Sequence, residues 1–225
     1  MIAAELVLGA LLLAVLAWEL WICEGAHFGR RFVVWLYDLA APRYDRIKHF
    51  SPSWEQRFLG EPVAAALAGL PQARVLDVGA GTGRLARALL PLPGFSGTII
   101  AAEPSRRMLA LGRKIAPVER NHWVRAWAVP LPLACDSIDL VVSLEILEFT
   151  PRPLASLREF ARVLRPGGWL LVTNRVGRQA RWILGRTFAR DRFPAVLRRL
   201  GFDSVETYRW QIDYDLVWGQ KPPQP

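Results

Sequence analysis

Apolar residues follow two different patterns along this chain. Near the start, an apolar run extends without a charge from Leu6 to Trp18. From residue 69 onward, short apolar runs of strand length alternate with segments of helical composition. The first pattern predicts one long apolar helix. The second predicts a parallel sheet between two layers of helices.

The apolar run reaches membrane-spanning length when it is extended to Cys23. A helix rises about 1.5 Å per residue, so this length approaches the hydrocarbon thickness of a bilayer. Apolar side chains cover every face, which disfavours an amphipathic surface helix, and no charged segment of the signal-peptide type precedes the run. We interpret residues 1–25 as a transmembrane anchor, with a helix buried in the protein or in an oligomer as the alternative.

The flanking residues predict how this anchor is oriented. Trp18 and Trp21 occupy the place of an interfacial aromatic belt, and basic residues gather after them. Positive charge favours the cytoplasmic side of a membrane, so the rest of the chain is expected in the cytoplasm, with the protein a single-pass membrane protein. The basic residues are Arg30, Arg31, Arg43, Arg46 and Lys48.

A glycine-rich turn is the strongest chemical signal in the chain. Residues 73–89 read ARVLDVGAGTGRLARAL, which predicts a strand, a turn and then a helix. Gly79, Gly81 and Gly83 stand at alternate positions, where they allow positive φ and the approach of a ligand to bare backbone. A dinucleotide-binding turn needs a glycine at the position of Arg84. The spacing therefore indicates a different nucleotide-like ligand.

The D-x-G-x-G-x-G pattern that begins at Asp77 resembles motif I of class I S-adenosylmethionine-dependent methyltransferases. Glu103 at the end of the next apolar run and the later phrase ARVLRPGGWLLVT strengthen the resemblance to the methyltransferase-11, UbiE-like type. It implies an α/β fold: a Rossmann-like seven-stranded methyltransferase sheet with helices on both faces, over residues 52–221. Residues 222–225 are expected to be a disordered tail.

The resemblance also implies S-adenosyl-L-methionine as cofactor. It assigns Glu103 to the two ribose hydroxyls, which a carboxylate can accept together, although Glu103 would alternatively cap the helix that begins at Ser105. Asp77 is expected to orient the turn by accepting backbone or cofactor amine hydrogens. The full set of expected cofactor-binding residues is Asp77, Gly79, Ala80, Gly81, Gly83, Glu103, Pro104, Trp127 and Leu144.

Two positions depart from the pattern of the family. Trp127 stands where relatives carry an acid that receives the adenine amino group, and Phe149 stands where a His is common. The third strand, which contains Trp127, is expected over residues 124–128, followed by strands over 138–143 and 169–173. Residues 165–168 are expected to form a turn. The sequence therefore leaves recognition of the adenine amino group to backbone or to Asp136, with Trp127 packing on the adenine ring.

The segment 26–51 is expected to form a juxtamembrane helical lid. Its phrase YDLAAPRYDRIK resembles a segment that closes over the cofactor in quinone and lipid methyltransferases, so Tyr44 is a candidate for cofactor contact, with packing of the lid as the alternative. A general base is needed only for an acceptor that must lose a proton. Tyr44, Glu145 and Glu148 are the candidates by position. Their alternatives are packing, cofactor contact and helix-start chemistry, respectively.

The composition is basic, with 29 Lys and Arg against 20 Asp and Glu. Arginine is concentrated between Arg152 and Arg199, which suits an anionic membrane surface or nucleic acid, or an ordinary solvated surface. Within this stretch, arginine alternates with aromatic and aliphatic residues in residues 174–193, so we interpret that segment as resting on the bilayer and admitting a lipid-like acceptor, with an ordinary surface loop as the alternative. Two cysteines in unrelated contexts and three scattered histidines predict no metal site.

These observations favour a membrane-anchored methyltransferase acting on an apolar or lipid-like small molecule. The alternatives are a methyltransferase of nucleic acid or protein and a non-catalytic membrane-bound scaffold that retains the fold. A nucleic-acid substrate is less expected, because the N/D-P-P-Y/F signature of amino-group methylation is replaced by SLEILEFTP after the fourth strand.

Overall fold

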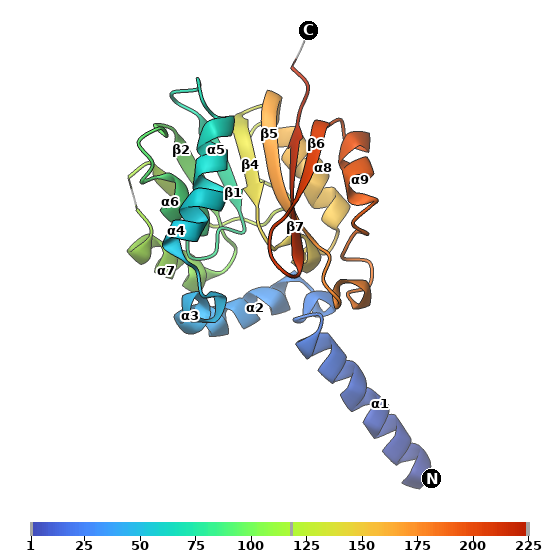
Figure 1. Ribbon diagram of the computed structural model, residues 1–225. Helices are drawn as coiled ribbons and strands as arrows, with labels where there is room; N and C mark the ends of the chain where they lie inside the picture. Colours follow the sequence, from blue (N-terminus) through green and yellow to red (C-terminus); the bar gives the residue numbers. More distant parts are fainter. Residues whose placement is uncertain (1, 118, 224–225) are drawn as a thin grey trace.

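The computed structural model describes residues 2–117 and 119–223. One long helix, α1 (Ile2–Trp21), projects from a domain built on a β-sheet (Figure 1). Short helices follow it along the edge of the domain that α1 approaches: η1 (Ala26–Phe28), α2 (Arg30–Ala40), η2 (Ala41–Arg43) and α3 (Tyr44–Lys48). The segment expected to be a helical lid is thus helical and lies against one end of the sheet.

The sheet has seven strands in the order β3-β2-β1-β4-β5-β7-β6. The first five strands run parallel, and β7 is antiparallel to both β5 and β6. This topology confirms the predicted Rossmann-like sheet. The strands are β1 (Arg74–Val78), β2 (Thr98–Ala102), β3 (Asn121–Val124), β4 (Ile138–Ser143), β5 (Leu164–Arg175), β6 (Asp203–Arg209) and β7 (Tyr214–Gln220).

Helices cover both faces of the sheet because successive strand side chains point to opposite sides. Val75 packs in one cluster with Leu85 of α6 (Arg84–Leu89). Its neighbour Leu76 packs in the other with Phe160 of α8 (Pro153–Val163). The first cluster also holds α4 (Pro52–Glu55), η3 (Gln56–Gly60) and α5 (Glu61–Ala66), and the second holds α9 (Phe193–Arg199). The remaining helices are α7 (Arg106–Ile115), η4 (Leu147–Phe149) and η5 (Ala180–Trp182).

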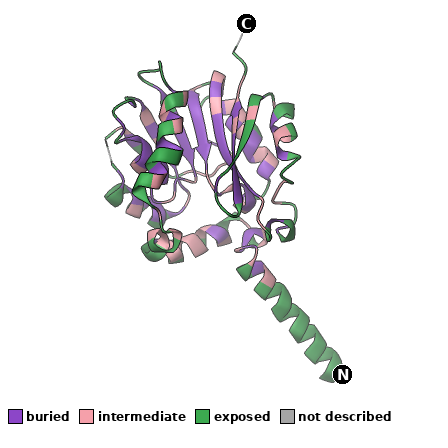
Figure 2. Ribbon diagram, viewed as in Figure 1, coloured by how far each residue is buried: buried purple, intermediate pink, exposed green. Residues whose placement is uncertain are grey.

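Helix α1 is exposed along most of its length (Figure 2). Within it the structure describes only Glu19 as buried, at the end that meets the domain. Its length and apolar composition are sufficient to cross a membrane, a test that signal sequences near an N-terminus also pass. Because its side chains pack against almost nothing in the chain, the stability of this helix depends on whether water or lipid surrounds it.

The third strand lies earlier than expected. Pairing with β2 runs from Ile99–Asn121 to Ala102–Val124, and no described residue of 125–128 belongs to a strand. The prediction of a strand over 124–128 was therefore wrong. The reason is register: β2 ends at Ala102, so its neighbour has no further partner. Residues 125–128 become a loop beyond the sheet edge.

The expected turn at residues 165–168 is the irregular first part of β5. The pairing with β4 shifts between Ile138 and Leu140, and Gly167 takes a φ of 78°. The Gly167 amide donates to Lys221 O, which keeps this segment attached to the sheet. In the expected tail, Pro222 and Pro223 have no regular structure, and residues 224–225 lie outside the described residues.

Candidate active site

The glycine turn joins β1 to α6 with three positive φ angles, of 74° at Gly79, 55° at Gly81 and 87° at Gly83. A Cβ on Gly79 would overlap Ile146, so the chain approaches the loop after β4 more closely than any other residue allows. Gly83 faces elsewhere: its Cβ would lie 2.7 Å from Ala116 Cβ. Gly83 lines neither cavity described below, and its smallness serves helix packing.

Glu103 lies beside this turn at the end of β2. Its carboxylate accepts from the Gly81 amide at 2.9 Å and from the Ser105 amide at 2.8 Å. Burial raises the pKa of Glu103 from 4.5 to about 7, although the two backbone donors lower it. Each carboxylate oxygen keeps a second lone pair, so Glu103 retains the capacity to accept from a ligand hydroxyl. Both of its predicted roles are therefore compatible: Glu103 supports the start of α7 and remains an acceptor.

Asp77 is a second buried carboxyl within β1. Burial and then the charge of Glu103 raise its pKa, Arg84 lowers it, and the resulting pKa is about 7 against an ordinary value of 3.8. Two neighbouring buried acids with raised pKa values favour a ligand that brings positive charge or hydroxyl donors, because either would stabilise the ionised carboxylates. Both requirements fit a ligand with a sulfonium, an ammonium group and a ribose.

A cavity of about 450 Å³ opens from the glycine turn. Its walls come from the ends of β1 and β2, the loops after β3 and β4, the first turn of α8 and the inner face of α2. Most of the lining is apolar. The cavity brings together expected residues Tyr44, Gly79, Gly81, Glu103, Pro104, Trp127, Leu144 and Glu145 with residues for which the sequence predicted no role in the site, among them Arg30, Val33, Tyr37, Arg152 and Ser156.

A smaller hollow of about 30 Å³ also borders the turn. Asp77 and Ala80 line this hollow, and neither is among the residues that line the large cavity. Tyr44 lines both, and its ring lies 3.7 Å from the position a Cβ would take on Gly81. Tyr44 thus covers the glycine turn from the lid.

Ion pairs and hydrogen bonds hold the lid on the domain. Asp38 of α2 accepts from Ser105 Oγ and from the Arg107 amide at the start of α7. Asp45 of α3 accepts from Arg87 Nη1 at 2.8 Å and from Thr82 Oγ1 at 2.5 Å. Both aspartates belong to the YDLAAPRYDRIK phrase, so this phrase encodes the attachment of the lid to the glycine turn, to α6 and to the start of α7.

The three candidate bases occupy different settings. Glu145 lines the cavity, but its carboxylate is bonded to Arg84 Nη1 at 2.8 Å and to Lys48 Nζ at 2.7 Å. Burial raises the pKa of Glu145, and the two cations outweigh that effect and lower it. Burial raises the pKa of Tyr44, as does the charge of Glu145. Glu145 is thus a poor proton acceptor at neutral pH.

Glu148 lies outside both cavities. It is 1% exposed, accepts a hydrogen bond from Tyr214 Oη at 2.5 Å and lies 3.8 Å from Arg175 Nη1. Burial raises its pKa, which the Tyr214 hydroxyl lowers in part. Glu148 is therefore placed to join the loop after β4 to β7 and β5.

Trp127 stands on the loop that follows β3. The Arg30 guanidinium of α2 lies 4.6 Å from its ring centroid and donates to Val129 O at 3.1 Å. Nothing in the local sequence around Trp127 indicates this partner, because Arg30 lies far away in the chain. Phe149, at the second unusual position, lines the same cavity and packs edge-on against Tyr37 of α2 at 5.8 Å between ring centroids.

A polar cluster attaches the end of α1 to the segment after β5. His27 Nδ1 lies 2.7 Å from Glu19 Oε2, and its Nε2 lies 2.9 Å from Leu184 O. Ile183 packs beside Cys23 and Ala26. Atoms of Glu19, Cys23 and His27 lie within 4.8 Å of one another, a grouping of ligand-type atoms that the scattered histidines did not predict. The cluster fixes the arginine- and aromatic-rich segment next to α1.

Comparison with known proteins adds two findings. Residues 76–172 match the family model described as a methyltransferase domain. In fold, the chain is similar to a SAM-dependent methyltransferase from Aquifex aeolicus, with a TM-score of 0.57 and 19% identity over 76% of this chain and 99% of that one.

Two curated relatives resemble the chain in sequence. The malonyl-[acyl-carrier protein] O-methyltransferase of Methylococcus capsulatus is 35% identical over 63% of this chain and 50% of its own length. The ubiquinone/menaquinone biosynthesis C-methyltransferase UbiE of Roseobacter denitrificans is 32% identical over 66% of this chain and 60% of its own length. The chain thus spans about half the length of the first curated relatives it matches.

Proposed function

We propose that this chain, a class I S-adenosylmethionine-dependent methyltransferase by its domain family and fold, is anchored in a membrane and methylates a lipid-like small molecule. The observation that carries the proposal is the large apolar cavity, which extends from the glycine turn to the inner face of α2. One end of this cavity suits the methyl donor. The other end suits an apolar acceptor.

The residues around the turn have the properties needed to hold S-adenosylmethionine. Glu103 would accept the ribose hydroxyls, the backbone of Gly79 and Gly81 would approach the ligand, and Asp77 would face its amino group. Pro104, Trp127 and Leu144 would pack around the adenine, since all three line the cavity. When bound, this cofactor supplies a methyl group on a positively charged sulfur.

Alignment and exclusion of water are the main tasks left to the protein. Well-aligned reactants gain on the order of 7 kcal/mol or more relative to free encounter. The lid contributes to both tasks because Val33 and Tyr37 form one wall of the cavity. Glu145 is engaged with Arg84 and Lys48, so we assign it to positioning and leave no obligatory base in the scheme.

The outer side of the lid supports contact with a membrane. Trp35 is 52% exposed, Leu39 53% and Ile47 61%, and these side chains come from α2 and α3. Helices with one apolar face and basic flanks bind at the headgroup boundary of a bilayer. Arg31, Arg43 and Arg46 supply the positive charge.

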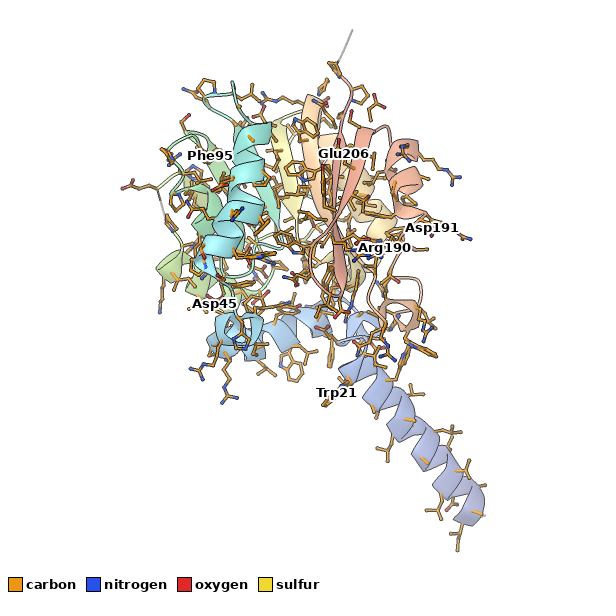
Figure 3. All side chains as sticks on the ribbon, viewed as in Figure 1. Trp21, Asp45, Phe95, Arg190, Asp191 and Glu206 are labelled. Atoms are coloured by element: carbon orange, nitrogen blue, oxygen red, sulfur yellow. The ribbon has the colours of Figure 1, made fainter. Side chains whose placement is uncertain are left out.

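The segment after β5 contributes further exposed apolar side chains at the same end of the molecule. Trp182 and Leu184 are exposed there, next to residues packed on the end of α1. Figure 3 labels Trp21 where α1 approaches the domain and Asp45 at the far end of the lid, beyond α2. Anchor, lid and segment would together rest on the cytoplasmic face of one membrane, with α1 inserted in it.

Transfer of a labelled methyl group tests the proposal. Full-length protein would be mixed with methyl-labelled S-adenosylmethionine and a membrane extract of the source cell, followed by solvent partition. We expect label in the organic phase for the wild type and for Glu61→Gln, an exposed control, and none for Glu103→Gln. Label in precipitated polymer would favour the nucleic-acid or protein alternative and contradict the proposal.

A further inference from the structure

We propose that the first turn of α8 forms an anion-binding subsite for the methyl acceptor, built from Arg152 and Ser156 and completed by Arg30 of α2. The acceptor would then be an amphiphile whose reacting group is an oxyanion. This inference rests on the proposed function and specifies which chemical class of lipid-like molecule the cavity accepts.

Ser156 provides the most specific observation. It is 1% exposed and lines the large cavity, yet its Oγ has no hydrogen-bond partner among the described residues. A buried hydroxyl without a partner costs free energy, which a ligand atom can recover. Ser143 offers a comparison inside the same fold: it is also buried and unpartnered, but it does not line the cavity.

Positive charge surrounds the same part of the cavity. Arg152 is the N-cap residue of α8, and Ala155 in the first turn also lines the cavity. The N-terminus of a helix carries partial positive charge. Arg30 of α2 also lines the cavity, held against Trp127 and Val129 O. Among the residues that the structure describes, no carboxylate lies within ion-pair distance of either guanidinium.

The carboxylates that line the cavity are committed elsewhere. Glu103 is bonded at the glycine turn to two backbone amides, and Glu145 is bonded to two cations. Acidic groups thus belong to the cofactor end, while the basic groups come from α2 and α8. An anionic acceptor would be drawn to the basic end and would find an O–H donor in Ser156.

An acceptor of this kind also removes the need for a base. A carboxylate or phenolate oxygen uses its own lone pair to form the bond to the methyl carbon. The sulfur–methyl bond breaks and its electron pair stays on sulfur, so the negative charge of the acceptor and the positive charge of the sulfonium cancel. No proton is transferred, in agreement with the engaged state of Glu145 and the position of Glu148 outside the cavity.

A matched pair of probes tests the subsite. We would measure binding of 1-naphthoate and of 1-naphthalenemethanol to full-length protein in lipid nanodiscs, in the presence of S-adenosylhomocysteine. The probes share an apolar body and differ in whether they carry a carboxylate. We expect 1-naphthoate to bind at least tenfold more tightly. Ser156→Ala and Arg152→Gln should each reduce this preference several-fold and leave the affinity for the alcohol unchanged.

Two control variants separate this subsite from general effects. Ser143→Ala removes a buried unpartnered hydroxyl of β4 outside the cavity. Arg158→Gln removes an exposed arginine from α8, the helix whose first turn forms the subsite. Both should keep the wild-type preference. Equal binding of the two probes, no binding of naphthoate, or equal losses in all four variants would overturn the inference. If the wild-type protein does not bind S-adenosylhomocysteine, the proposed function itself is overturned.

Discussion

The guanidinium of Arg84 joins the carboxylate of Glu145 at 2.8 Å, in a contact shielded from solvent on both sides. Arg84 also forms a two-point contact with Glu55 through Nε at 2.7 Å and Nη2 at 2.8 Å. One arginine therefore links the helix at the start of the domain to the loop after β4. The contact has two consequences, one for stability and one for catalysis.

Glu145→Gln should lower the free energy of unfolding, and its effect on the rate of methyl transfer should be small by comparison. The amide removes the charge that faces Arg84 and Lys48, while Glu55 still pairs with Arg84. We expect the free energy of unfolding to fall by about 1–3 kcal/mol. Denaturant titration measures this loss. If stability is unchanged while the transfer rate falls a thousandfold, Glu145 acts as a base and our assignment is wrong.

Gly79→Ala should abolish cofactor binding and reduce stability. Its φ of 74° strains any residue with a Cβ, and that Cβ would overlap Ile146. The expected loss of unfolding free energy is about 2 kcal/mol or more. Gly94→Ala is the matched control, because a Cβ there meets nothing within 4 Å. Thermal unfolding with and without S-adenosylhomocysteine distinguishes the two variants, and similar behaviour would contradict the assignment.

The raised pKa of Glu103 predicts opposite effects of pH on stability and on binding. Its carboxyl binds a proton more readily in the folded protein, with a pKa of about 7 against 4.5. Its contribution to the stability of the ligand-free fold is therefore full below pH 4.5 and is lost as the pH rises through 7.

Binding should respond in the other direction, because ribose hydroxyls favour the ionised carboxylate. Affinity for S-adenosylhomocysteine should rise about tenfold between pH 6 and pH 8 through this one group, since about a tenth of it is ionised at pH 6. Calorimetry at pH 6 in buffers of different ionisation enthalpy should detect proton release. A pH-independent affinity without proton release would contradict this account of Glu103.

Charged residues on the outer face of the lid should impair access to a membrane-borne acceptor. The double variant Trp35→Glu and Leu39→Glu places two carboxylates on the exposed face of α2, where a headgroup boundary disfavours them. We expect transfer to extracted membranes to fall about tenfold and S-adenosylhomocysteine affinity to stay the same. Leu70→Glu, on a loop before β1, is the control with similar exposure. Equal transfer rates in the two variants would argue against a membrane-facing lid.

The sequence predicted the fold because its signals are local. The alternation that sends Val75 and Leu76 to opposite faces, and the glycines that need positive φ, are readable within a few residues. The third strand was misplaced because its end depends on where β2 stops. Register with another strand is not encoded in the apolar run around Trp127.

The site was only partly predictable for a related reason. Gly81 and Glu103 are marked by their positions at strand ends, and the structure brings them within 2.9 Å. Arg30 and Ser156 reach the cavity through the placement of whole helices. Their chemistry depends on packing partners distant in the chain, and a single sequence gives no sign of it.

Calorimetric titration of the protein with S-adenosylhomocysteine tests the central claim most directly, since the proposed function and the acceptor subsite both require a methyl donor at the glycine turn. In nanodiscs at pH 8 we predict saturable binding to one site, lost in Glu103→Gln and retained in Glu61→Gln. No binding by the wild type would contradict the account and indicate a scaffold that has kept the fold alone.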